Sequence, residues 1–137
     1  MSFPSHCLRG IPNTSFLEDG NIGSHLFYFP EIPRGDGWKE LSINWVDDDL
    51  VFEFTLSQKK EDGEFQFKSG FVIVPRNEID RLKNRLTIPS EALAYERQSL
   101  DENPYHGNIL LQKDVSRKTM KLIAAGLTLA ISEIRLK

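Results

Sequence analysis

The strongest pattern in the sequence is a helical repeat of apolar residues between Ser116 and Ile134. Ser116 can cap the start of this helix. Leu122 and Leu129 fall outside the repeat, so the helix is apolar over much of its circumference and needs cover on more than one side. We therefore predict a long buried C-terminal helix that packs on a sheet and contacts a partner chain. The i, i+3, i+4, i+7 repeat consists of Met120, Ile123, Ala124, Leu127, Ile131 and Ile134.

Before this helix the chain has the period-two alternation typical of short β-strands. Leu41, Ile43 and Trp45 alternate with polar residues, and residues 50–56 alternate in a similar way. The acidic run between these segments predicts a turn that joins two strands into a hairpin. Shorter strands are predicted at 24–29, 71–74, 93–96 and 108–112, although a helical turn could begin at Ser90 and Glu91. Ile79, Leu82 and Leu86 have helical spacing and predict a short surface helix over 77–86.

Residues 1–23 are rich in glycine and proline and predict an irregular N-terminal arm, or one short strand around Cys7 to Ile11. The whole pattern predicts a single α+β domain over residues 1–137. Its expected architecture is a mostly antiparallel sheet of five to seven short strands, with the long buried C-terminal helix and one short helix.

Composition narrows the class of protein. A net charge of −3 with 20 acidic and 17 basic residues argues against nucleic-acid binding through overall charge, since that affinity comes from Lys and Arg. Cys7 is the only cysteine, which excludes an intrachain disulfide and a thiol-rich metal site. The longest nearly apolar stretch, Leu122 to Ile131, is much shorter than the ~20 residues that cross a bilayer. We expect a cytoplasmic protein with no membrane contact and no cofactor.

The segment from Asn103 to Asn108 is the first candidate site, because it places polar side chains in a turn directly before a strand. His106 can serve as a general base or a metal ligand, with Tyr105 and Asn108 beside it as further catalytic candidates. The alternative is that the segment only forms turns and that His106 hydrogen-bonds the backbone.

The acidic run Asp47-Asp48-Asp49 is the candidate metal site, with Asp47 and Asp49 as the ligands, because hard cations prefer clustered carboxylate oxygens. A metal-dependent nuclease uses such a group. The alternative is a solvated hairpin turn, since the run lacks the spaced ligands and the glycine of a calcium loop.

Three residues are candidates for binding a partner or a ligand. Arg9 lies in an apolar stretch, where it can pair with a buried carboxylate or bind a phosphate. Trp38 lies in a glycine-rich loop, and His106 is the third candidate.

The sequence lacks glycine-rich phosphate loops, HExxH zinc helices, GxSxG elbows and CxxC pairs. Their absence favours a non-catalytic protein-binding or adaptor module that works in a multi-protein complex, without excluding an enzyme. Its partner is expected to be another protein or a second copy, bound through the C-terminal helix. One alternative is a small metal-dependent hydrolase or nuclease that uses His106 and Asp47 to Asp49. A second is a small-molecule sensor with a pocket between helix and sheet.

Overall fold

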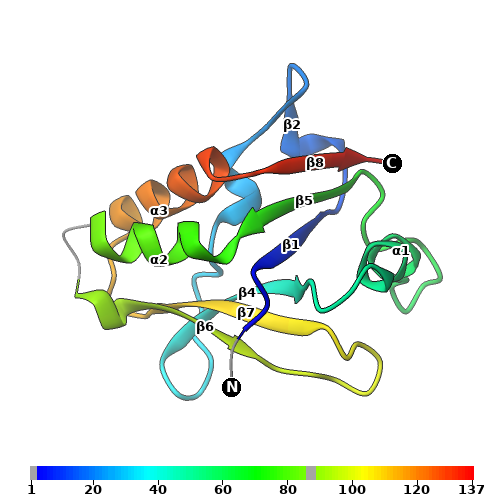
Figure 1. The fold of residues 1–137 in the computed structure, drawn as a ribbon. Coiled ribbons are helices and arrows are strands. Elements are labelled where there is room, and N and C mark those ends of the chain that lie inside the picture. The colour runs from blue at the N-terminus through cyan, green and yellow to red at the C-terminus, as the bar shows by residue number, and fades with distance from the viewer. Residues whose placement is uncertain (1–2, 86–88) are drawn as a thin grey trace.

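A six-stranded antiparallel sheet with the strand order β6-β7-β4-β1-β5-β8 organises the computed structural model, which describes residues 3–85 and 89–137 (Figure 1). Its strands are β1 His6–Ile11, β4 Trp38–Trp45, β5 Gly70–Pro75, β6 Leu93–Arg97, β7 His106–Gln112 and β8 Glu133–Leu136. A small second sheet pairs β2 Leu17–Glu18 with β3 Asn21–Ile22. The helices are α1 Leu50–Ser57, α2 Arg76–Arg85 and α3 Arg117–Leu129, with 3-10 turns η1 Thr14–Phe16, η2 Ser24–Phe27 and η3 Ser90–Ala92. The predicted α+β class with a mostly antiparallel sheet is confirmed.

One face of the sheet carries the larger core and is covered by α2, α3 and η2 (Figure 1). Alternate residues of the strands point into this core, among them Ile43, Trp45 and Val72. The helices α2 and α3 pack closely, since a Cβ atom added to Gly126 would lie 2.5 Å from the side chain of Leu82. This glycine therefore lets the two helices lie side by side over the sheet.

The opposite face is covered by α1 over only part of its area. Leu8, Phe71 and Ile73 point to this side and form a smaller core with Val51 of α1. The helix lies at one end of the sheet, at the same end as the loop between β6 and β7 (Figure 1). Other parts of this face are covered by Phe67, which lies over Gly10, and by Arg34, which bonds to Glu40 and Glu96.

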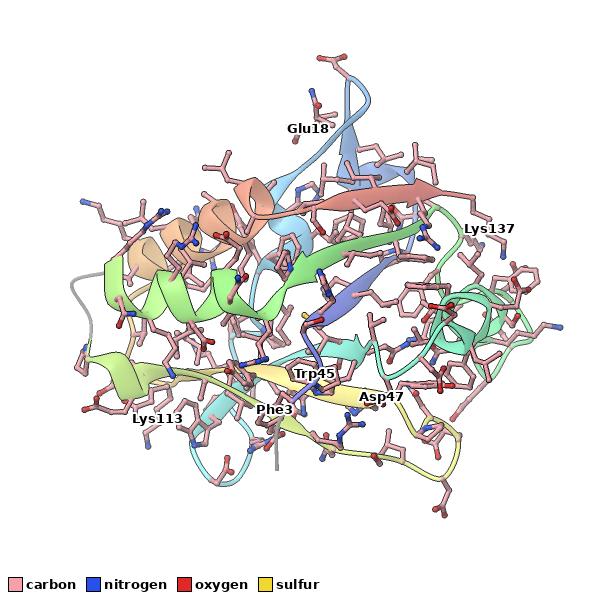
Figure 2. All side chains as sticks on the ribbon, viewed as in Figure 1. Phe3, Glu18, Trp45, Asp47, Lys113 and Lys137 are labelled. Carbon is pink, nitrogen blue, oxygen red and sulfur yellow. The ribbon has the colours of Figure 1, made fainter. Side chains whose placement is uncertain are left out.

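The segment predicted as an irregular arm contains a central strand of the sheet. β1 pairs with β4 on one side and with β5 on the other, which confirms the alternative of a strand around Cys7 to Ile11. Phe3, just before this strand, packs its ring against Trp45 at 5.0 Å between centroids (Figure 2). Phe3 is therefore packed against the main core.

The C-terminal helix begins as predicted but ends earlier. Ser116 caps it, since its hydroxyl oxygen accepts from the amide of Thr119 at 3.1 Å. The helix stops at Leu129, and the residues predicted as its last turn form β8, in which Ile134 is 43% exposed. The prediction of a helix to Ile134 was wrong because pairing with β5 supplies the backbone of these residues with hydrogen bonds that a longer helix would have supplied.

Two predicted strands are helical. Residues 50–56 form most of α1, so the predicted hairpin does not exist and β4 pairs with β1 and β7 instead. Val51 and Thr55, four residues apart, are the buried positions of this helix, and the carboxylate of Asp48 accepts from the amide of Leu50 at its start. Residues 24–27 form η2, in which Leu26 and Phe27 are buried.

Other predicted elements are confirmed. The surface helix is α2, with Ile79 and Leu82 buried, whereas Leu86 lies outside the described residues. The strand at 93–96 is β6, preceded by the helical turn η3, and the strand at 108–112 is part of β7.

Within the described part of the chain, no helix combines the length and the apolar character that crossing a bilayer requires.

Candidate functional site

The hydrogen-bonded ladder between β1 and β4 ends early and leaves a seam in the middle of the sheet. The two strands pair at Cys7 with Trp45 and at Leu8 with Asn44, although β1 continues to Ile11. Beyond that point β1 stays paired with β5, and β4 stays paired with β7. Backbone groups that face the seam must therefore find partners other than a neighbouring strand.

Arg9 supplies one of these partners. Its Nη1 atom donates to the carbonyl oxygen of Ser42 at 2.7 Å, and its Nε atom donates to the carbonyl oxygen of Leu26 at 2.8 Å. Burial lowers the pKa of this guanidinium to about 10. No carboxylate of the described residues forms an ion pair with it, so carbonyl oxygens take the place of the predicted acidic partner.

A cleft of about 640 Å³ lies over this seam, on the face that α1 covers only in part. Its floor is formed by β1, β4 and the start of β7, and its walls are formed by residues 54–67 and 100–103. The phenyl ring of Phe67 lies directly over Gly10, where an added Cβ atom would come within 2.1 Å of it. Phe67 and Leu100 give the cleft apolar walls, whereas most other residues that line it are polar.

Asn44 joins the floor of the cleft to both walls. Its Nδ2 atom donates to Thr55 Oγ1 at 2.9 Å and to Gln58 Oε1 at 3.0 Å. Its Oδ1 atom accepts from Asn103 Nδ2 at 2.8 Å, and Asn103 Oδ1 in turn accepts from the amide of Tyr105. Since Asn44 is buried, this single side chain fixes the width of the cleft.

We expect Asn44→Ala to lower the free energy of unfolding by about 2 to 4 kcal/mol, because the buried amide of Asn103 loses its acceptor and Gln58 loses its donor. Urea denaturation followed by circular dichroism measures this change. Ser42→Ala is the matched control, since Ser42 lies on the same strand and lines the same cleft but is exposed. Equal stability of the two variants would show that the asparagine does not hold the walls together.

His106 lines the cleft and makes the predicted alternative contact with the backbone. Its Nδ1 atom lies 3.1 Å from the carbonyl oxygen of Gln98. A carbonyl oxygen only accepts, so Nδ1 carries the proton and Nε2 of the neutral ring is an acceptor. The ring is therefore suited to receive a hydrogen bond from a ligand.

The other two catalytic candidates have different surroundings. Tyr105 donates its hydroxyl to Asp48 at 3.2 Å, and burial together with the charge of Asp48 raises the pKa of Tyr105. Asn108 is fully buried, and its Nδ2 atom donates to Glu96 at 2.8 Å and to Gln98 at 2.9 Å. Its Oδ1 atom has no hydrogen-bond partner among the described residues. Neither side chain lines the cleft with His106.

The acidic run leads into α1 instead of forming a hairpin turn. Both carboxylate oxygens of Asp47 accept from Arg97, at 3.0 and 2.6 Å. Asp47 lies just beyond the end of β4, on the side of α1 (Figure 2). Asp49 occupies the N-cap position of the helix without a side-chain cap bond. In residues 3–85 and 89–137, no three His, Cys, Asp or Glu side chains come together as a group that could hold a metal ion.

Trp38 lies away from the cleft, in a smaller hollow of about 510 Å³ that also includes Arg34 and Lys113. Arg34 bonds to Glu96 at 2.6 Å and to Asp36 at 2.8 Å. These bonds lower the pKa of both carboxyl groups and raise that of Arg34. The structure therefore does not bring Arg9, Trp38 and His106 into one site.

Sequence reasoning missed most of the residues that line the cleft. Asn44 and Ser42 have the pattern of ordinary polar strand residues, and Gln58 and Gln66 lie in a segment without a distinctive motif. The seam becomes visible only when the length of β4 is compared with the short part of it that pairs with β1. No local pattern in the sequence encodes where that pairing ends.

No family model matches the chain, and neither a curated protein nor a solved structure matches it.

Proposed function

We propose that this chain is a non-catalytic binding protein that holds an extended segment of a partner protein in the cleft between α1 and the sheet. The observation that carries this proposal is the seam at which β1 and β4 separate beneath the cleft. An extended peptide presents alternating amide and carbonyl groups, which can bond to strand backbone left without a neighbour.

The alternation of the ladder identifies the backbone groups at the seam. The amide of Val46 donates to the carbonyl oxygen of His6, and Leu8 pairs with Asn44. Because bonding direction alternates along antiparallel strands, the backbone groups of Gly10 and Ser42 also face the seam. The carbonyl oxygen of Ser42 already accepts from Arg9. The amide of Ser42, the backbone groups of Gly10, the side-chain NH2 group of Gln58 and the Nε2 atom of His106 form a polar surface that suits a peptide backbone.

The residues at the rim of the cleft indicate which kinds of side chain the bound partner segment carries. Lys59, Lys60, Glu61 and Glu102 balance each other in charge, so the rim attracts neither a strongly acidic nor a strongly basic segment. Phe67 and Leu100 offer apolar contact area on opposite walls. A partner segment that carries little net charge and one or two apolar side chains therefore fits the balanced charges of the rim and the apolar walls.

A small polar molecule is the second candidate ligand, because the volume of the cleft lies within the range of about 300 to 1,000 Å³ typical of small-molecule sites. Native mass spectrometry of the purified protein distinguishes the two, since a retained small molecule adds a discrete mass. The metal-dependent hydrolase stays a prediction. Among the described residues, His106 lines the cleft and Asp47 does not, and neither belongs to a group of side chains that could hold a metal ion.

We expect peptides selected from a random display library against the protein to lose binding to Ser42→Trp by more than about tenfold, a change of about 1.4 kcal/mol in affinity. Ser42 is exposed on the floor of the cleft, so an indole ring there fills the space that the peptide needs without entering the core. Isothermal titration calorimetry measures the affinity of each selected peptide.

Ile32→Trp is the control for added surface bulk, since Ile32 is exposed and does not line the cleft. Amide shifts in NMR spectra should map to Gly10, Asn44 and Asn103 when a selected peptide binds. Peptides that bind Ser42→Trp as tightly as the wild type, or a selection that yields no binder, would count against the cleft as a peptide site.

A further inference from the structure

The outer edge of β8 is an open strand edge with apolar side chains. β8 is the last strand in the order of the sheet and pairs only with β5 among the described strands. Ile134 and Leu136 are 43% and 57% exposed, and Leu129, at the end of α3 just before this strand, is 90% exposed. An edge of this kind is a template for pairing with another strand.

The direction of the backbone groups along β8 follows from its pairing. The amide of Lys137 donates to the carbonyl oxygen of Ser69, and Glu133 and Arg135 lie opposite Ile73 and Phe71 of β5. Because the bonding direction alternates along an antiparallel strand, Glu133 and Arg135 direct their backbone groups toward β5. Ile134 and Leu136 therefore direct their amide and carbonyl groups toward the open edge.

The side chains of β8 are complementary to those of a second β8 strand. Glu133 and Arg135 lie on one face of the strand and already contact each other within the chain. In an antiparallel pair centred on Ile134, Glu133 of one copy lies opposite Arg135 of the other, and the reverse. Charges on a short edge strand usually prevent association, but this order of charges attracts an identical copy.

We propose that two copies of this chain associate by antiparallel pairing of their β8 strands around a two-fold axis at Ile134. The outward amide and carbonyl of Ile134 bond to those of Ile134 in the second copy. Ser132 of one copy lies opposite Leu136 of the other, which brings the end of α3, with its exposed Leu129, alongside that leucine. The contact lies beyond β5, away from the seam between β1 and β4, so it is independent of the proposed function of the cleft.

Charge reversal tests this pairing directly. In Glu133→Arg, every charged pair across the axis becomes Arg opposite Arg, and in Arg135→Glu every pair becomes Glu opposite Glu. We expect each variant alone to raise the dimer dissociation constant by about tenfold or more. An equal mixture of the two variants should restore association, because arginines of one copy then face glutamates of the other. Sedimentation velocity over a micromolar concentration series measures all three samples.

Two further variants keep the test independent of folding. Asp101→Arg makes the same change in net charge as Glu133→Arg at an exposed position outside β8, and it should leave the dissociation constant unchanged. Ile134→Pro deletes the outward amide without removing a bond to β5, and it should abolish association while the thermal unfolding transition remains.

A monomeric wild type at these concentrations overturns the proposal. A dimer that neither charge reversal weakens, or a mixture that stays monomeric, overturns it as well. The proposal is supported if the wild type associates, each charge reversal alone weakens association, and the mixture of the two variants restores it.

Discussion

Leu127→Asp is expected to leave the protein unfolded at room temperature. The side chain of Leu127 is completely buried in the main core, where α3 packs against η2 and the sheet. A carboxylate there would lie among the apolar side chains of the main core, and burying a charge in such surroundings costs more than about 4 to 5 kcal/mol. That loss is comparable to the whole stability of many domains, which is about 5 to 15 kcal/mol. Far-ultraviolet circular dichroism and amide dispersion in NMR spectra measure the result.

Leu129→Asp is the matched control, because it makes the same change two residues further along the helix at a side chain that is 90% exposed. Its expected cost is below about 1 kcal/mol and comes mainly from a negative charge near the C-terminal end of the helix dipole. If both variants unfolded in urea at the same concentration, the assignment of the buried and exposed faces of α3 would be wrong.

Gly70→Ala is expected to lower the free energy of unfolding by about 3 kcal/mol or more and to release β8 from the sheet. Gly70 has φ +107°, a conformation that side chains disfavour. A Cβ atom there would lie 2.0 Å from the carbonyl oxygen of Arg135 and 2.9 Å from the Cα atom of Leu136. Both atoms belong to the backbone of β8, which can relieve the collision only by moving away from β5.

Gly63→Ala separates the effect of backbone conformation from that of crowding. Gly63 has φ +87° but no atom within 4 Å of an added Cβ. Its expected cost is about 1 to 2 kcal/mol from the left-handed conformation alone. Hydrogen exchange of the amides of Glu133 and Arg135 should accelerate in Gly70→Ala and stay unchanged in Gly63→Ala. Unchanged exchange in both variants would show that Gly70 does not control the docking of β8.

The candidate site could be predicted only in part. The segment from Asn103 to Asn108 was identified because turn residues before a strand display their side chains, and His106 and Asn103 do line the cleft. Arg9 was recognised as an unusual cation in an apolar stretch, but its partners are carbonyl oxygens from η2 and β4, which lie far from it in the sequence. Asn44, which joins the walls of the cleft, had no local signal at all.

The sequence by itself determined the elements whose pattern matches one backbone conformation. The repeat from Met120 to Leu127 specified a helix, and the alternation from Leu41 to Trp45 specified a strand, because in each case one spacing buries the apolar side chains on one side. It also determined the α+β class, since strand-like segments precede a strongly helical one.

Only the tertiary structure decided which backbone partners each segment received. Residues 50–56 fit a strand by alternation and a helix by the spacing of Val51 and Thr55, and packing against Leu8 and Phe71 selected the helix. Ile134 continued the helical repeat, yet the open edge of β5 offered its backbone a ladder and ended the helix. The cleft depends on where β1 separates from β4. Such choices are made by hydrogen bonds and contacts between residues distant in sequence, and a local periodicity contains no information about them.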